Sequence, residues 1–308
     1  MGYDIIGDIH GHAERLEALL ERLGYVHRSG AWRHQTRSAV FVGDLIDRGP
    51  GQLPTLKLVR AMMDAGSARA TMGNHEFNAI AWATPDPVSE GHHLRSRHGA
   101  KGANNRRQHA AFLNEVGEES AEHREWTNWF FELPLWIQEP EFQVVHACWS
   151  PKHMDFLRPH LRSGALLTTG IVEAASRKGT AFHDALETVL KGVEVKLPVG
   201  CHFTDKEGHV RHEIRTRWWN ADLTTYRAAY IGPTGAEIPD VQMDAHQRLP
   251  EPDRPTFIGH YWFDPTQTIA PAAIRVACVD YSVAMGGPLV AYRFDGEMEL
   301  SKDKFVAV

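Results

Sequence analysis

Three short clusters of polar residues near the start of the chain carry side chains that could do chemistry. They are residues 7–11 (Gly-Asp-Ile-His-Gly), 43–49 (Gly-Asp-Leu-Ile-Asp-Arg-Gly) and 73–76 (Gly-Asn-His-Glu). Each cluster follows a short apolar run, and the glycine at its start lets the backbone turn sharply. Open α/β sheets bind ligands at the carboxyl ends of their strands. The sequence therefore predicts one site assembled from three loops.

The donor atoms in these clusters are the oxygens and nitrogens of Asp, His and Asn side chains. A donor set of this kind, without thiolates, suits divalent ions such as Mn²⁺, Fe²⁺ or Zn²⁺. Two further histidines fit the same pattern, because His146 follows the apolar run 142–145 and His260 follows the run 256–259. Alone, each would more often be a hydrogen-bonded core histidine than a ligand. Their order behind the three clusters favours a metal site.

The elements that must position these clusters follow from hydrophobic periodicity. Apolar strands are predicted over residues 3–6, 39–42 and 68–71, spaced roughly 30 residues apart as βαβ units require. The leucines of residues 16–23 fall at i, i+3, i+4 and i+7, which is the stripe of an amphipathic helix. Helical spacing recurs over residues 56–63. The start of the chain is therefore predicted to be α/β with parallel strands.

The remainder of the chain mixes helical and strand-like patterns. A helical pattern extends over residues 151–194, and short strands and loops are expected over 195–250. Further strands, bounded by Gly, Pro and Asp turns, are predicted over residues 142–145, 256–258, 274–279 and 289–294.

Residues 91–114 differ from the rest of the chain because they contain no acidic residue. The segment has five Lys or Arg residues and four histidines. We expect it to be a solvated loop or a cap. The alternative is that its charge steers a polyphosphate or a phosphopeptide toward the site.

Composition and charge exclude several classes of protein. The chain has 308 residues, of which 43% are hydrophobic and 23% charged, as in ordinary globular proteins rather than disordered, collagenous or coiled-coil ones. No apolar run is long enough to cross a bilayer, and no export signal precedes the first strand. The formal charge of −6 argues against a general nucleic-acid binder. We therefore expect a cytoplasmic protein with neither membrane nor nucleic acid as a partner.

The cysteines do not suggest a zinc or redox site. Cys148, Cys201 and Cys278 lie far apart and form no Cys-x-x-Cys pair. Cys148 lies near His146 in the sequence, but nothing supplies it with a base, which disfavours a cysteine nucleophile. Trp218 and Trp219 are expected in the core rather than as platforms for a nucleobase.

The motifs, in this order and at this spacing, resemble those of calcineurin-like metallophosphoesterases. The resemblance is to the branch that contains serine/threonine phosphoprotein phosphatases and symmetrical diadenosine tetraphosphate hydrolases, and it extends from Asp8 to His260. It is most specific over residues 43–49. It implies an α/β fold: a four-layer metallophosphoesterase sandwich of two mixed β-sheets flanked by helices. We expect a single domain over residues 1–308, with cap-like excursions near 86–135 and 165–250.

The resemblance also implies a centre of two divalent metal ions, with Mn²⁺ as the first choice and Fe, Zn or Ni as alternatives. Two such ions can hold a bridging hydroxide and polarise phosphoryl oxygens. Asp44 would bridge both ions. The other ligands implied are Asp8 and His10 for the first ion, and Asn74, His146 and His260 for the second.

Three neighbouring residues are implied to act on the substrate. Arg48 resembles the family's phosphate clamp, since a guanidinium can bind two phosphate oxygens at once. His75 resembles the general acid that protonates the leaving oxygen, and Asp47 would orient it. Glu76 is expected to support the site without touching the substrate. A second substrate-binding arginine is expected between the last two histidines, where the candidates are Arg215 and Arg217.

Two departures concern the neighbours of His146 and His260. Phosphoprotein phosphatases usually have two glycines after the first of these histidines and an arginine before the Gly-His of the second. This chain has Ala147 and Cys148 at the first place and Ile258 at the second. These differences indicate a bacterial-type relative and leave the expected ligands unchanged.

Three functions are compatible with this pattern. The first is hydrolysis of a phosphate monoester, on a phosphoprotein or a small phosphorylated molecule, by the metal-bridging hydroxide. The second is cleavage of a symmetrical dinucleoside tetraphosphate, for which the basic segment would hold additional negative charge. The third is a catalytically silent scaffold, which the presence of all six ligand positions together with Arg48 and His75 disfavours. The sequence leaves the oligomeric state open.

Overall fold

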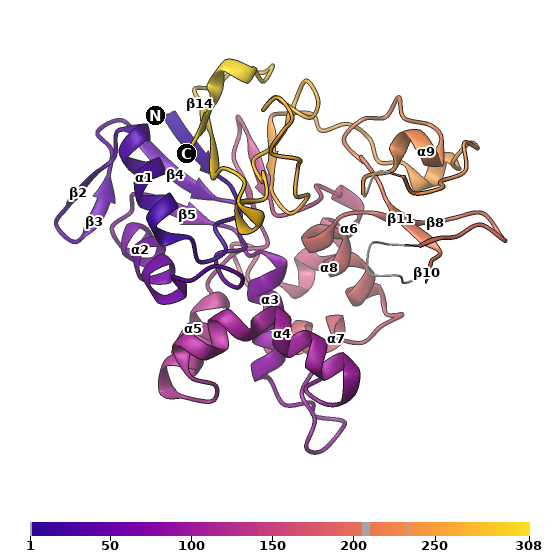
Figure 1. Ribbon diagram of the computed structural model, residues 1–308, viewed down its shortest axis with the longest axis horizontal. Coiled ribbons are helices and arrows are strands. Elements are labelled where there is room, and N and C mark those ends of the chain that lie inside the picture. Colours follow the sequence, from indigo (N-terminus) through magenta and orange to yellow (C-terminus); the bar gives the residue numbers. More distant parts are fainter. Residues whose placement is uncertain (1, 205–209, 233–234) are drawn as a thin grey trace.

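The computed structural model describes residues 2–204, 210–232 and 235–308, and its core is a pair of β-sheets (Figure 1). The first sheet has five strands in the order β15-β14-β1-β4-β5. Its three N-terminal strands are parallel, whereas β14 and β15 are antiparallel neighbours. The strands are β1 (Gly2–Ile6), β4 (Arg37–Phe41), β5 (Ala68–Ala70), β14 (Val290–Phe294) and β15 (Phe305–Ala307).

The second sheet has four strands in the order β13-β12-β7-β6. The three strands β13, β12 and β7 are parallel, and β6 is antiparallel to β7. Both sheets are therefore mixed, as predicted. The strands are β6 (Trp136–Gln138), β7 (Gln143–Val145), β12 (Thr256–Ile258) and β13 (Val276–Cys278).

The two sheets pack face to face through alternate side chains of their strands. Ile5 and Val40 of the first sheet share an apolar cluster with Val144 and Phe257 of the second. The ring of Phe294 lies with its centre 5.6 Å from that of Phe257. Because successive side chains of a strand point to opposite faces, the intervening residues face outward and must be covered by helices.

Helices cover the outward faces and complete the predicted four layers. Ile6 and Phe41 of the first sheet and Val145 of the second belong to a larger apolar cluster that also contains helical leucines and valines. The helices are α1 (Ala13–Leu23), α2 (Gln52–Asp64), α3 (Asn74–Ala83), α4 (Gly99–Val116), α5 (Ala121–Phe130), α6 (Pro151–Leu157), α7 (Thr169–Ala175), α8 (Ala181–Lys191) and α9 (Tyr226–Ala229).

The part of residues 193–243 that the structure describes has a small apolar cluster of its own. Val195, Phe203, Ile214 and Tyr226 are buried in it, away from the two main clusters. Within this region β8 (Glu194–Lys196) pairs with β11 (Glu213–Arg215), and β9 (Phe203–Thr204) pairs with β10 (Val210–Arg211).

The expected excursion over 165–250 includes residues 205–209 and 233–234, which lie outside the described residues. The remaining short elements are the hairpin β2 (Val26–Arg28) and β3 (Ala31–Arg33) and the 3₁₀ turns η1 (Arg158–His160), η2 (Ala245–Gln247), η3 (Val283–Met285) and η4 (Lys302–Lys304).

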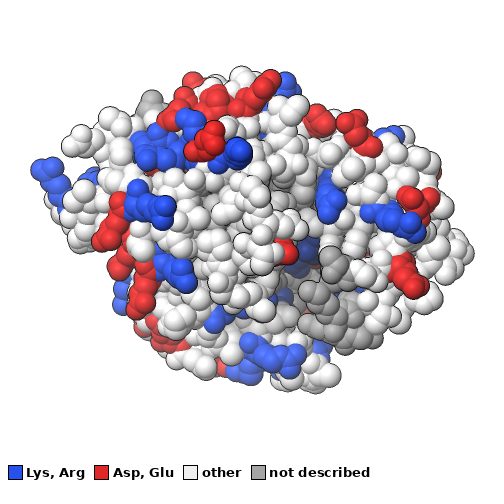
Figure 2. Space-filling model, turned by 45° about the horizontal axis from the view of Figure 1, so that its top comes forward, with Lys and Arg blue, Asp and Glu red and all other residues white. Residues whose placement is uncertain are grey.

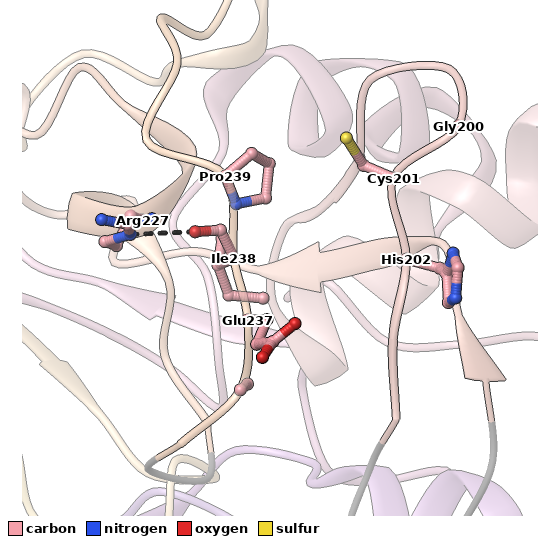
Figure 3. Close-up of a pocket in the computed structure, with 8 residues that line it drawn as sticks. Gly200, Cys201, His202, Arg227, Glu237, Ile238 and Pro239 are labelled. Carbon is pink, nitrogen blue, oxygen red and sulfur yellow. Dashed lines mark hydrogen bonds between the residues drawn. The ribbon is translucent and has the colours of Figure 1, made fainter.

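An open pocket of about 560 Å³ lies on this small subdomain (Figure 3). The segment Gly200–His202 borders one side of it and the segment Ala236–Pro239 another. Arg227 lies beside the second segment and donates a hydrogen bond of 2.9 Å to the carbonyl oxygen of Ile238. None of the side chains predicted to bind metal or phosphate lines this pocket.

The expectation of a solvated loop is wrong for residues 99–114, which lie within helix α4. Its buried face contains Asn105, His109 and Phe112. Two positions of this buried face, Asn105 and His109, are polar, so hydrophobic periodicity does not reveal the helix.

Two of the five basic residues of the segment, Arg97 and Arg106, are paired with acidic residues nearby. The guanidinium carbons of Arg97 and Arg106 lie 5.0 and 5.1 Å from the ring centre of Trp82. Arg97 is paired with Glu119 at 2.7 Å, and Arg106 is paired with Glu118 at 2.7 Å. On the face drawn in Figure 2, basic side chains are scattered among acidic ones and form no continuous patch.

Within the residues that the structure describes, no helix combines the length and the apolar character needed to cross a bilayer.

Candidate metal centre

The three predicted loops meet at the carboxyl ends of β1, β4 and β5, and Glu76 ties two of them together. One carboxylate oxygen of Glu76 accepts hydrogen bonds from the backbone N–H groups of Asp44, at 2.9 Å, and Gly73, at 2.8 Å. The other oxygen accepts from Leu45 N–H at 2.8 Å. A Cβ at Gly73 would lie 2.2 Å from the amide nitrogen of Asp44, so only glycine allows the two loops this close. Glu76 therefore occupies the supporting position expected for it.

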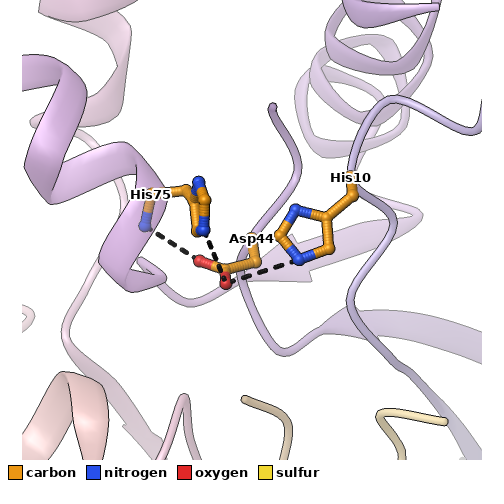
Figure 4. A group of neighbouring side chains, drawn as sticks. All are labelled: His10, Asp44 and His75. Atoms are coloured by element: carbon orange, nitrogen blue, oxygen red, sulfur yellow. Dashed lines mark hydrogen bonds and ion pairs between the residues drawn. The ribbon is translucent and has the colours of Figure 1, made fainter. Parts of the chain in front are cut away.

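One group of possible ligands is formed by His10, Asp44 and His75 (Figure 4). Asp44 Oδ2 lies 3.7 Å from Nε2 of His10 and 3.9 Å from Nε2 of His75. Nδ1 of His10 is hydrogen-bonded to the carbonyl oxygen of Ile46 at 2.9 Å. A bond of this kind leaves Nε2 free to bind a metal ion and fixes the orientation of the ring.

A second group is formed by Asp44, His146 and His260, with Asn74 beside it. Nε2 of His146 lies 3.3 Å from Asp44 Oδ2 and 3.3 Å from Asn74 Oδ1. Nδ1 of His260 lies 2.7 Å from the same Asn74 oxygen. Nδ1 of His146 is occupied by the carbonyl oxygen of Val42 at 2.8 Å. Asp44 Oδ2 thus belongs to both groups, which is the arrangement expected of a bridging carboxylate.

Asp8 lies beside these groups and contacts the last histidine through the backbone. Its Oδ2 accepts a hydrogen bond of 3.0 Å from the amide of His260, while Oδ1 is buried without a partner. A Cβ at Gly259 would lie 2.0 Å from Oδ1, so the glycine before His260 is required by the position of this carboxylate. The structure therefore brings all six predicted ligand positions into one region.

The donor atoms fit divalent metal ions. Asp8 Oδ1, His10 Nε2 and His260 Nε2 are buried and have no hydrogen-bond partner. Burying an unpaired polar atom costs free energy, which coordination to a cation would recover. Burial raises the pKa of Asp8, and the nearby negative charge of Asp280 raises it further. Cations in the site would relieve this repulsion, and oxygen and imidazole donors suit such ions.

His75 is held by Asp47 next to the metal centre. Its Nδ1 lies 2.5 Å from Asp47 Oδ2, and its Nε2 faces Asp44. Burial acts to lower the pKa of His75, but the negative charges of Asp44 and Asp47 outweigh it and raise that pKa. The ring is thus held with Nδ1 toward Asp47 and Nε2 toward Asp44.

The sequence analysis missed His109, which contacts the other oxygen of Asp47. Its Nδ1 lies 2.7 Å from Asp47 Oδ1, and the side chain is 3% exposed. No local motif marks this residue. His109 is distinguished by its place on the buried face of α4. Hydrophobic periodicity does not reveal that face, because some of its residues are polar.

Arg48 stands exposed at the mouth of the site, over the ring of Trp262. The guanidinium carbon lies 5.2 Å from the ring centre. The backbone N–H of Trp262 donates a hydrogen bond of 2.7 Å to Asp280, whose side chain is buried. Neither Trp262 nor Asp280 was singled out from the sequence. Together they would hold the arginine in place before a phosphate arrives.

We expect Trp262→Leu to weaken phosphate binding through Arg48. An exposed cation–π contact contributes roughly 0.5–1 kcal/mol, so KM should rise about 2- to 5-fold while kcat changes little. Steady-state kinetics would measure both constants, and Trp262→Phe should lie between the variant and the original protein. An unchanged KM in Trp262→Leu would show that the ring does not position Arg48.

Of the two candidates for a second arginine, Arg215 is partly buried at the end of β11 and Arg217 is exposed beyond it. Arg215 is partly buried, with one guanidinium nitrogen 3.4 Å from Glu194 and Nε without a partner. Burial, followed by the positive charge of Arg215, holds the pKa of His260 well below its usual range. The side chain of Arg217 is exposed.

The residues after His146 are accommodated by the core. Ala147 and Cys148 are fully buried, and the carbonyl oxygen of Ala147 accepts a hydrogen bond of 3.2 Å from Nε1 of Trp218. Trp218 and Trp219 are core residues, as predicted. Burial raises the pKa of the Cys148 thiol, which makes it a poor nucleophile.

Comparison with known proteins identifies the family. Residues 1–162, just over half of the chain, match the model of the calcineurin-like phosphoesterases. The chain belongs to this family. The predicted resemblance is thereby confirmed.

The family assignment is accompanied by partial similarity to named relatives. The chain is 37% identical over 97 residues to the asymmetrical bis(5'-nucleosyl)-tetraphosphatase PrpE of Bacillus subtilis, over 31% of this chain and 40% of that protein. It is 43% identical over 81 residues to the symmetrical enzyme of Chromohalobacter salexigens, over 25% of this chain and 26% of that one. The chain thus spans well under half of these relatives.

A solved structure covers more of the chain at lower identity. It is a protein serine/threonine phosphatase from Saccharomyces cerevisiae, with a TM-score of 0.49 and 12% sequence identity over all of this chain and 79% of that one.

Proposed function

We propose that this protein is a metal-dependent hydrolase of phosphate monoesters, on a phosphoprotein or a small phosphorylated molecule. One observation carries the proposal: Asp44 Oδ2 is shared by two groups of ligands, and Nε2 of His75 faces the same carboxylate. Carboxylates that face several buried histidines with unpartnered nitrogens are suited to cations rather than to core packing.

The proposed ligand sets are those expected from the family. When bound, two divalent ions would supply an activated water and neutralise charge on the phosphoryl oxygens. Manganese is the first choice for these oxygen and nitrogen donors, with iron, zinc or nickel as alternatives. Asp8 and His10 would hold one ion, Asn74, His146 and His260 the other, and Asp44 both.

The chain's own residues would bind the phosphate and move one proton. Arg48 would bind two phosphate oxygens from the mouth of the site. As the water oxygen bonds to phosphorus and the bond from phosphorus to the leaving oxygen breaks, Nε2 of His75 would give its proton to that leaving oxygen. Asp47 would keep the Nδ1 side of the ring occupied, at its observed distance of 2.5 Å.

The distribution of charge favours a monoester over a polyphosphate. Two of the five basic residues of segment 91–114, Arg97 and Arg106, are paired with Glu119 and Glu118. Screened and paired charges of this kind attract a polyanion weakly.

We further propose that residues 86–135 and 165–250 form the walls of the site within a single domain.

A second candidate, cleavage of a symmetrical dinucleoside tetraphosphate, is favoured by Arg95. Its guanidinium is held by neutral oxygens, those of Asn78 at 2.5 Å and Gln108 at 2.9 Å, rather than by a carboxylate. Asn78 lies one helical turn after His75 on α3, and Gln108 precedes His109. The contacts with Asn78 and Gln108 hold this positive charge between α3 and α4, where we propose that a further phosphate of a polyphosphate binds. Of the partial relatives, the Chromohalobacter salexigens enzyme is named as symmetrical and the Bacillus subtilis enzyme as asymmetrical.

Arg95→Gln distinguishes the two candidates by its effect on each substrate. A hydrogen bond to a charged group contributes roughly 1.5–3 kcal/mol, so losing it should lower kcat/KM for diadenosine tetraphosphate by about 10- to 100-fold. Hydrolysis of a monoester should change by less than about 3-fold, because its single phosphate occupies the metal centre. The matched control is Arg106→Gln, whose guanidinium is already paired with Glu118. Equal effects on both substrates would remove Arg95 from substrate selection.

The proposed function is tested by chromatography of products. Protein loaded with Mn²⁺ is incubated with a mixture of a phosphothreonine peptide and diadenosine tetraphosphate. Dephosphorylated peptide with intact dinucleotide is the expected result. Nucleoside diphosphates with intact peptide would establish the second candidate instead, and no hydrolysis of either with any of the four metals would support the silent scaffold.

A further inference from the structure

Helix α4 delivers a buried histidine to the carboxylate that holds His75. Nδ1 of His109 lies 2.7 Å from Asp47 Oδ1, while Nδ1 of His75 lies 2.5 Å from Asp47 Oδ2. The three side chains are buried, with exposed fractions of 3%, 2% and 8% for His109, Asp47 and His75. The two oxygens of one carboxylate are therefore each bonded to a different imidazole.

We propose that His109 is a positioning residue for proton donation by His75, acting through Asp47. This inference rests on the proposed function, since it assigns a residue to the same site. It adds a part that the three motif loops do not contain, because His109 comes from the 86–135 excursion. The excursion would then contribute to the proton-transfer step as well as to the wall of the site.

The proposal follows from what each contact does to the orientation of Asp47. A carboxylate bonded at one oxygen can still turn about its χ2 torsion, whereas donors at both oxygens select one orientation. The backbone of Asp47 is held as well, since its N–H donates to Oε1 of Gln52 at 2.6 Å. With Asp47 immobile, the ring of His75 keeps Nδ1 toward the carboxylate and Nε2 toward the metal centre.

His109 is itself fixed in place by aromatic neighbours. Its ring centre lies 5.0 Å from that of Phe112 and 6.1 Å from that of Trp82. Trp82 belongs to α3, the helix that also carries His75, and it lies beneath the guanidinium groups of the basic segment. The position of His109 is therefore set by the same packing that joins α4 to the site.

The experiment compares His109→Ala with His109→Asn, in which the amide nitrogen can occupy the place of Nδ1. Proton donation matters most for a poor leaving group and least for one that departs without a proton. For a phosphoserine peptide, His109→Ala should lower kcat by about 10- to 100-fold, which is less than the roughly 10²- to 10⁴-fold that general acid catalysis contributes in total. For p-nitrophenyl phosphate the loss should be less than about 3-fold, and KM should change little for either substrate. His109→Asn should recover most of the lost activity on the phosphoserine peptide.

The matched control is His123→Ala. His123 is another buried histidine, with its ring centre 5.9 Å from that of Phe112 and Nδ1 accepting from the amide of Glu119. The hydrogen bonds and ring contacts of His123 do not include Asp47. His123→Ala should therefore change kcat by the same factor for both substrates. Losses that are equal for both leaving groups in His109→Ala, without recovery in His109→Asn, would overturn the proposal and reduce His109 to a packing residue.

A second measurement does not depend on turnover. In protein loaded with diamagnetic Zn²⁺, ¹⁵N NMR of the imidazole nitrogens reports whether the proton of His75 sits on Nδ1. The His75 signals are assigned by their absence in His75→Asn. We expect a protonated Nδ1 in the original protein and in His109→Asn, and a mixture of tautomers in His109→Ala. An unchanged His75 spectrum in His109→Ala would also overturn the proposal, whereas absence of phosphatase activity with the expected spectra would contradict only the proposed function.

Discussion

Asp44→Asn should abolish tight metal binding and hydrolysis together. Asp44 Oδ2 lies 3.3 to 3.9 Å from the Nε2 atoms of three histidines, so one oxygen faces both groups of ligands. Burial acts to raise the pKa of Asp44, but the surrounding histidines, His146 first, hold it well below its usual range. The side chain is therefore a carboxylate, and the neutral amide removes a negative charge from between the two proposed ions.

The expected loss exceeds that of a residue that only supports a ligand. Mutation of such a supporting residue typically lowers metal affinity or activity by 10- to 100-fold. Asp44→Asn should therefore lower metal affinity and activity each by more than about 100-fold. Metal content after dialysis and kcat/KM for a monoester measure the two effects. Asn keeps an oxygen that can accept the 2.9 Å hydrogen bond from the amide of His75, so the fold should be retained.

A matched control is available on the outer face of the same sheet. Asp4 is a fully buried aspartate of β1 that pairs with Arg37 at 2.9 Å and with Arg293 at 3.2 Å, away from the metal centre. Asp4→Asn should lower thermal stability but leave metal content unchanged. Full metal occupancy in Asp44→Asn would contradict the bridging assignment.

His75→Asn should slow turnover while leaving metal content intact. General acid catalysis contributes roughly 10²- to 10⁴-fold, and we expect kcat on a phosphoserine peptide to fall by that factor. Activated esters such as p-nitrophenyl phosphate should lose much less, because their leaving group departs without a proton.

The metal content of His75→Asn decides between two roles for this side chain. His75 Nε2 lies within the ligand group of His10 and Asp44, so its geometry also permits direct coordination. Its Nδ1 bond to Asp47 is compatible with either role. A variant that loses metal would make His75 a ligand, and unchanged turnover would remove it from the mechanism.

The fold and the outline of the centre could be predicted because both depend on local patterns. The strands before residues 7, 43 and 73 are short apolar runs, and parallel strands joined by helices bring their carboxyl ends to one edge of a sheet. His146 and His260 follow β7 and β12, which are also parallel to one another. Once the strands are recognised, it can be predicted without knowledge of side-chain packing that these residues lie close together.

Other features depend on contacts between distant segments, where no local pattern exists. Arg48 and Trp262 come from opposite ends of the chain, and the aromatic ring lies beneath the guanidinium only because two separate loops meet at the mouth. Arg215 lies opposite Glu194 in the pairing of β11 with β8, whereas Arg217 lies beyond the end of β11 and is exposed.

The sequence by itself determined the family and the residues of three loops, because glycine turns and apolar strands are local consequences of backbone sterics and burial. The tertiary structure decided what surrounds those loops. Arg97 and Arg106 pair with Glu119 and Glu118, and His109 turns inward to Asp47, which lies 62 positions earlier in the sequence. Such contacts arise from the packing of α4 against the rest of the molecule, and pairings set by packing leave no periodic signal in the sequence.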